Sequence, residues 1–155
     1  LAPKLGKSMS DKIYLLDYED QQEDFFSDFV LIGITCTFNT EKFVWLLHKY
    51  LNIAFHRQLE MDVFISKSED EQQYFPVFTY QAPLKSTEHV LYKQKEKTDF
   101  LLPEIKNVDY LWGMRGGDAN NEASYLIPII KQIPEIQFIQ VLDPKKLKNK
   151  LNIVL

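Results

Sequence analysis

The chain has 155 residues, of which 45% are hydrophobic and 14% aromatic, a composition typical of one globular domain that argues against a disordered or fibrous chain. Its formal net charge of -4 and pI near 5.4 argue against nucleic-acid binding by the molecule as a whole, but leave a local basic patch open. The single cysteine, Cys36, cannot form an internal disulfide, which favours the reducing cytoplasm.

The chain has no apolar run close to the roughly 18 residues that a membrane-spanning helix needs, so we expect no membrane association. The first methionine is Met9, and the preceding LAPKLGKS has no apolar signal-peptide region. Residues 1–8 are therefore interpreted as a tag remnant or a disordered extension. Residues 9–155 are expected to form a single α+β domain.

The first predicted elements are a strand and a helix. In residues 29–38, FVLIGITCTF, alternate side chains from Val30 to Phe38 are all apolar, which predicts a central strand with one buried face. Residues 40–52 carry apolar side chains at helical spacing, and Thr40 is predicted to cap that helix. Residues 53–64 then alternate apolar and polar, which predicts a strand with one wet face.

The acidic SKSEDEQQ predicts a solvated loop, and two hairpin strands are predicted after it, over residues 74–82 and 88–97. Pro76 has no N–H for a sheet hydrogen bond, so the first of these strands should lie at an edge or start late. A further strand is predicted at VDYLW, residues 108–112.

The last third of the chain predicts a helix, a strand and a short basic helix. Residues 120–133 have a helical pattern with Asn120 or Asn121 as cap, and Pro128 would kink this helix unless its regular part begins near Ser124. A strand is predicted over residues 135–142. Asp143 is then predicted to cap a short basic helix, DPKKLKNKL.

This element order favours an α+β fold with a mainly antiparallel sheet and helices packed on one face. It resembles a ferredoxin-like βαββαβ plan with extra central strands. The other face of the sheet, with Thr35 and Thr37 on it, is expected to be open.

The stretch LPEIKNVDY resembles the signature of the bacterial IPExxxVDY family, with Leu102 in place of the isoleucine. The matching positions are Pro103, Glu104, Val108, Asp109 and Tyr110. The similarity of layout extends from about Met9 to the C-terminus. The resemblance implies no established activity, ligand or catalytic residue.

Two sets of residues are candidates for a ligand site. Glu104 and Asp109 are candidates for paired carboxylates in acid–base chemistry, with a structural role as the alternative that we favour. Arg115, Gly116 and Gly117 lie between a predicted strand and a predicted helix, where backbone N–H groups and an arginine can hold an anion. A simple glycine turn is the favoured alternative there.

Two further sets are candidates for partner contacts. Trp45 and Trp112 suit a protein interface, with core packing as the alternative. Lys145, Lys146 and Lys148 suit an acidic partner or a phosphate backbone, with a solvated helix face as the favoured alternative.

No metal-ligand spacing or catalytic set stands out, so the sequence predicts no metal, no cofactor and no catalytic residue. Cys36 is expected to be a core residue. The leading hypothesis is a domain that binds a protein partner or forms a homodimer. The alternatives are a sensor or enzyme for a small anionic ligand, and an RNA- or ribosome-associated factor.

Overall fold

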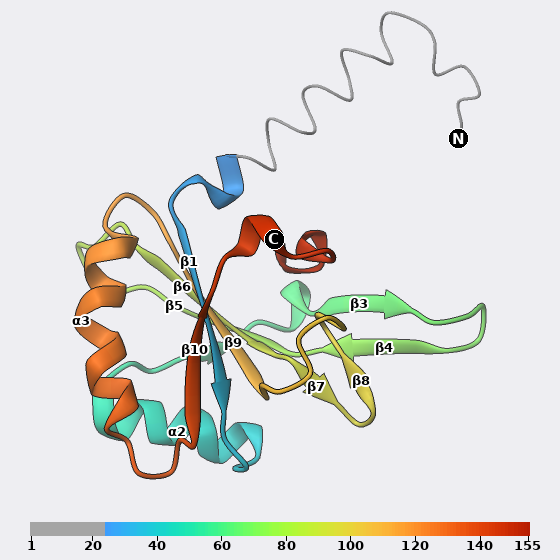
Figure 1. Cartoon of the computed structure of the whole chain (residues 1–155), viewed down its shortest axis with the longest axis horizontal. Helices are drawn as coiled ribbons and strands as arrows, with labels where there is room; N and C mark the ends of the chain where they lie inside the picture. The colour runs from blue at the N-terminus through green and yellow to red at the C-terminus, as the bar shows by residue number, and fades with distance from the viewer. Residues whose placement is uncertain (1–23) are drawn as a thin grey trace, which may run out of the picture.

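The computed structural model describes residues 24–155 (Figure 1). The strands are β1 (Phe29–Thr35), β2 (His56–Arg57), β3 (Val63–Ser66), β4 (Gln72–Phe75), β5 (Val77–Tyr80), β6 (Glu88–Lys93), β7 (Lys95–Glu96), β8 (Asp99–Phe100), β9 (Tyr110–Arg115) and β10 (Phe138–Leu142). The longer helices are α2 (Thr40–Leu51) and α3 (Ala119–Lys131), and the 3-10 turns are η1 (Leu59–Met61), η2 (Pro144–Lys146) and η3 (Lys150–Ile153). In these residues no helix is both long and apolar enough to cross a membrane.

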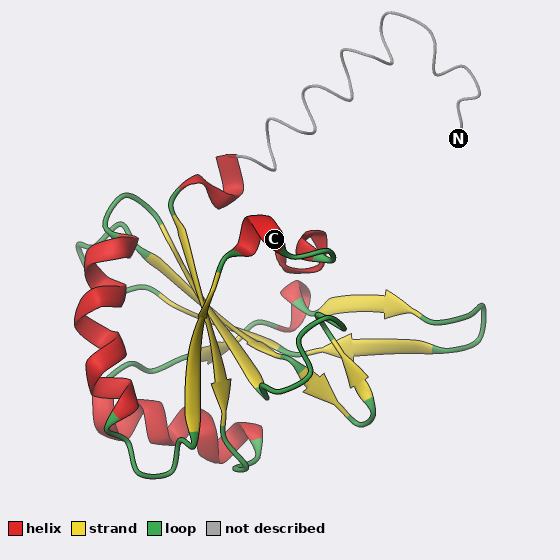
Figure 2. Ribbon diagram, in the orientation of Figure 1, coloured by secondary structure: helices red, strands yellow, loops and turns green. Residues whose placement is uncertain are grey.

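Six strands form the main sheet in the order β10-β1-β9-β6-β5-β2, and each neighbouring pair is antiparallel (Figure 2). Two small antiparallel ribbons, β3-β4 and β7-β8, stand beside it. The predicted α+β class with a mainly antiparallel sheet is confirmed. The ferredoxin-like plan is not confirmed.

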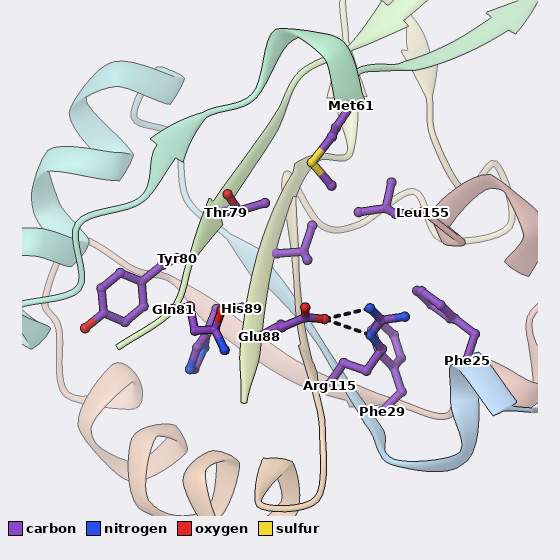
Figure 3. A pocket seen from close by; sticks show the side chains of 11 residues that line it. Phe25, Phe29, Met61, Thr79, Tyr80, Gln81, Glu88, His89, Arg115 and Leu155 are labelled. Atoms are coloured by element: carbon purple, nitrogen blue, oxygen red, sulfur yellow. Dashed lines mark hydrogen bonds and ion pairs between the residues drawn. The ribbon is translucent and has the colours of Figure 1, made fainter. Parts of the chain in front are cut away.

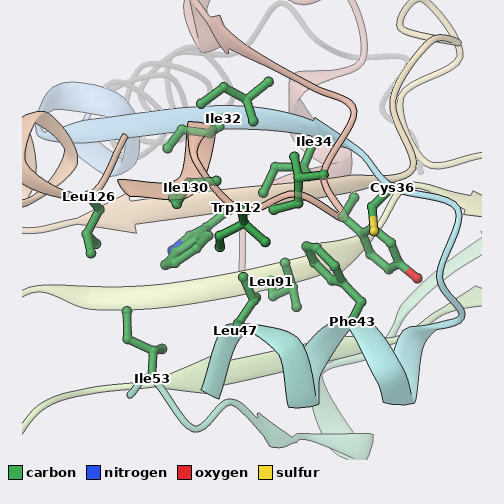
Figure 4. Close-up of a cluster of buried hydrophobic side chains, with 14 of the residues drawn as sticks. Ile32, Ile34, Cys36, Phe43, Leu47, Ile53, Leu91, Trp112, Leu126 and Ile130 are labelled. Carbon is green, nitrogen blue, oxygen red and sulfur yellow. The ribbon is translucent and has the colours of Figure 1, made fainter. Parts of the chain in front are cut away.

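Both longer helices pack on one face of the sheet, as predicted, and enclose an apolar core (Figure 4). Helix α2 places Phe43, Leu46 and Leu47 in that core, because these residues recur at helical spacing. Its cap is one residue earlier than predicted, since the Asn39 side chain accepts a hydrogen bond from the backbone N–H of Lys42 at 2.9 Å.

The opposite face of the sheet is also covered, so the expected open face is wrong. A second core cluster there contains residues of the 101–108 segment, the C-terminal turns and the phenylalanines that lead into β1. The hydroxyl of Thr35 donates to the Asn107 carbonyl at 2.7 Å. A Cβ on Gly33 would lie 2.9 Å from a methyl carbon of Val108, which shows how closely this segment packs on β1.

The predicted strand over residues 53–64 is wrong, because the chain turns within it. Only β2 joins the main sheet, η1 follows, and β3 pairs with β4 in a separate ribbon. The turn is fixed by the guanidinium of Arg57, which pairs with the carboxylate of Asp62. Pro76 separates β4 from β5, so that β5 starts after the proline, and β5 and β6 form the predicted hairpin.

Helix α3 begins at Ala119, and Pro128 lies inside it. The N-cap position is Asp118, with no side-chain cap, so the predicted caps at Asn120 and Asn121 are wrong. The predicted basic helix at the C-terminus is two 3-10 turns instead. Asp143 does cap the first of them, accepting a hydrogen bond from the N–H of Lys145 at 3.1 Å.

Candidate functional site

Four of the five residues that match the IPExxxVDY signature make structural contacts, namely Glu104, Val108, Asp109 and Tyr110, while Pro103 is exposed. The ring of Tyr110 stacks on Phe43 with 4.1 Å between centroids, and its hydroxyl donates to the Phe38 carbonyl at 2.8 Å. Burial raises the pKa of Tyr110 to about 12. The Asp109 carboxylate accepts a hydrogen bond from the Cys36 N–H at 2.9 Å, which fixes the chain where it leaves β1.

Glu104 holds a different part of the chain. Its carboxylate oxygens accept hydrogen bonds from the backbone N–H and the side-chain amide of Asn149, at 2.7 and 2.8 Å. Partial burial raises the pKa of Glu104, but the bonds from Asn149 outweigh it, so the pKa lies below its ordinary value. Glu104 is hydrogen-bonded to the C-terminal turns, and Asp109 is hydrogen-bonded to the chain at the end of β1. The structure therefore does not bring the two carboxylates together as a catalytic pair.

Arg115 lies at the end of β9 and uses its charge within the fold. Both Nε and Nη2 donate to one carboxylate oxygen of Glu88, at 3.1 and 2.6 Å, and the guanidinium lies 4.7 Å from the ring centroid of Phe25. Gly116 has a φ of 127° and donates its N–H to the Asp28 carbonyl at 3.2 Å. Gly117 is exposed, and a Cβ added to it would meet no neighbouring atom within 4 Å. This loop has the geometry of a glycine turn.

The two tryptophans have opposite environments. Trp112 is fully buried among the helix-side core residues, so the prediction that it contacts a partner is wrong and the core-packing alternative holds. Trp45 is 56% exposed on α2, with the Lys49 ammonium 5.2 Å from its ring centroid. Only Trp45 is therefore available to a partner.

Lys145, Lys146 and Lys148 are all exposed around η2. None of them forms an ion pair with another residue in the 24–155 range. They form a short basic turn that directly follows β10.

A buried polar cluster that sequence reasoning missed lies around His89, which is 2% exposed. The indole N–H of Trp112 donates to His89 Nδ1 at 3.1 Å, and Nε2 lies 3.5 Å from a carboxylate oxygen of Glu122. Burial lowers the pKa of His89, although Glu122 acts in the opposite direction. Both ring nitrogens have partners, so His89 links β6 to α3 and leaves no nitrogen free for a substrate. The alternation in EHVLYK places His89 on the same face of the strand as the apolar Leu91, so this pattern could have predicted the burial of His89.

Two cavities border this cluster. One, of about 320 Å³, lies between β5, β6 and the phenylalanines before and within β1 (Figure 3). Glu88 and Arg115 in its lining form an ion pair with each other. The second, of about 440 Å³, lies against α3, with Tyr80, Glu122 and Tyr125 in its lining. Neither brings a nucleophile next to a free base, and no group of three potential metal ligands gathers in residues 24–155.

The feature with the best geometry for binding is the open edge of the main sheet at β10. This strand, FIQVL, has no charged residue and no proline, and Phe138 and Val141 in it are 51% and 59% exposed. Phe138 pairs with Thr35 and Val141 pairs with Ile32, so the two exposed side chains lie on opposite faces of the sheet.

The opposite edge of the sheet is protected in the usual way. Strand β2 has only two residues, and its Arg57 places a charge at the edge. Short length and charge prevent unwanted strand pairing, and β10 has neither protection. The contrast makes β10 the candidate interface.

Comparison of the chain with protein-family models, with curated proteins and with solved structures finds no match in any of the three.

Proposed function

We propose that this domain acts by binding a protein chain, and that the partner adds a strand to the sheet beside β10. The observation that carries the proposal is the uncharged β10 edge, on which Phe138 and Val141 are more than half exposed. An edge strand directs N–H and C=O groups away from the sheet, and an extended segment satisfies them by pairing. Exposed apolar side chains on both faces then add contacts with the partner strand.

The internal contacts of the candidate ligand residues support binding over catalysis. The carboxylates of Glu104 and Asp109 accept hydrogen bonds from separate chain segments, and Arg115 is paired with Glu88. An anion at the Arg115 loop would have to displace that carboxylate. The basic turn after β10 is exposed but small, and it belongs to a chain with a net charge of -4, which gives little support to an RNA-binding role.

We also propose that the chain belongs to the IPExxxVDY family and that it works in the cytoplasm. The contacts of Val108, Asp109 and Tyr110 support membership of the family, because they give the signature residues a role in holding the fold. A signature of this kind does not require a shared reaction. The single buried Cys36 supports the second, since no disulfide stabilises the described fold.

The test is affinity capture from native cells with three forms of the chain: wild type, Val141→Lys and the control Leu59→Lys. Both variants place a lysine at an exposed apolar position, 59% and 71% exposed, but only Val141 lies on the β10 edge. A partner recovered with wild type and with Leu59→Lys, but lost with Val141→Lys, supports the proposal. Equal recovery with all three forms contradicts it, provided thermal melting shows that both variants fold.

A further inference from the structure

We propose that the strand added at β10 is β10 of a second copy of this chain, so that two main sheets join into one across a two-fold axis at Gln140. This inference rests on the proposed function and names its partner. In Figure 1 the sheet is seen along its edge, with β10 in front of the other strands. In residues 24–155, β10 pairs with β1 alone and its outer side carries no strand.

The residues of β10 are complementary to themselves in the antiparallel direction. With the axis at Gln140, Phe138 lies opposite Leu142 of the second copy, and Ile139 lies opposite Val141 of the second copy. The first pair lies on one face of the joined sheet and the second pair on the other, because side chains alternate along each strand. Every residue of β10 is then paired, and all pairs besides the central glutamines are apolar.

Neighbouring registers are worse. An axis at Val141 would place Ile139 opposite the charged Asp143, and an axis at Ile139 would place Val141 opposite Gln137. A shift that moves the axis between two residues would put side chains of opposite faces across from each other, which buries polar groups and exposes apolar ones. The axis at Gln140 is therefore the register that the strand specifies.

The size of the contact sets the expected affinity. Five paired residues a side give an interface below the roughly 1,200 Å² of stable complexes. We therefore expect a weak dimer that forms with rising concentration, with a dissociation constant on the order of micromolar or weaker.

The test is a disulfide across the proposed axis. The Cys36 thiol is buried, and the variant Gln140→Cys adds one half-buried thiol at the position that would lie opposite itself. Directly opposite residues in an antiparallel pair have Cα atoms about 4.5–5.5 Å apart, which a disulfide can span. Ser124→Cys, exposed on α3 away from the edge, is the matched control.

Under mild oxidation we expect Gln140→Cys to form a covalent dimer at least about tenfold faster than Ser124→Cys, because pairing raises the effective concentration of the two thiols. Adding Val141→Lys to the Gln140→Cys chain should remove the difference, and sedimentation equilibrium of the wild type should show a monomer–dimer equilibrium. Equal rates for the two cysteine variants, or a wild type that is monomeric up to about 1 mM, would overturn the inference. If the dimerisation tests fail in this way but affinity capture still recovers another protein that is lost with Val141→Lys, the proposed function stands and the partner is not a second copy.

Discussion

Gln94 anchors the segment that contains LPEIKNVDY, and its replacement tests why that segment covers the sheet. The side chain of Gln94 is fully buried directly after β6. Its amide N–H donates to the carbonyl of Leu102 at 2.9 Å and also to the carbonyl of Ile105, and its oxygen accepts the N–H of Leu102 at 2.9 Å. Gln94 therefore bonds to both backbone groups of a buried leucine, whose carbonyl also accepts the N–H of Ile105 at 2.9 Å.

We expect Gln94→Ala to lower the free energy of unfolding by roughly 3–5 kcal/mol. Each buried backbone group that loses its partner costs about 1–3 kcal/mol. The N–H of Leu102 and the carbonyl of Ile105 lose the partner that Gln94 supplies, whereas the carbonyl of Leu102 keeps the N–H of Ile105. The shorter side chain also leaves a cavity, which adds to the loss. Gln94→Met, which keeps most of the volume but cannot hydrogen-bond in the same way, should recover only the cavity contribution.

The measurement is urea unfolding followed by far-ultraviolet circular dichroism, with the midpoint and the slope fitted separately. Gln81→Ala is the control, because Gln81 is exposed and makes one side-chain bond, to the carbonyl of Lys85 at 2.9 Å. The control should lose less than about 0.5 kcal/mol. If Gln94→Ala also loses less than about 1 kcal/mol, or if Gln94→Met is as stable as the wild type, the hydrogen bonds do not hold the segment in place.

Two further predictions concern the sheet and the buried histidine. Gly113→Ala should cost roughly 1–3 kcal/mol in urea unfolding, because the new Cβ would lie 2.5 Å from a ring carbon of Phe29, whereas Gly117→Ala, with open space around it, should be near neutral; equal effects would contradict the packing argument. The folded-state pKa of His89 lies below its ordinary 6.5, so the unfolded chain takes up a proton first and stability should fall as the pH drops below about 6.5. In unfolding curves at pH 7.5 and 5.5, His89→Gln should lose less stability than the wild type over that interval; an unchanged difference would show that other groups set it.

Sequence periodicity was a good guide where one local pattern extends over a whole element. The strand β1 and the helix α2 were predicted because their apolar residues recur every second position and every third or fourth position. The cap was assigned one residue late, since Asn39 and Thr40 are both good caps and only the backbone direction selects between them. The buried Cys36 was predicted from the same alternation, and burial raises the pKa of its thiol.

The sequence by itself therefore determined the α+β class, the apolar faces of β1 and α2, and the turn at Gly116, because local spacing and backbone preference fix these. Only the tertiary structure decided that residues 53–66 turn between two sheets, that Trp112 is buried, and that Glu104 bonds to Asn149, 45 positions away in the chain. The open edge at β10 also belongs to the second group. A strand's own residues show which of its faces is buried, but its place at the edge depends on which strands pair, and those pairings join residues far apart in the sequence.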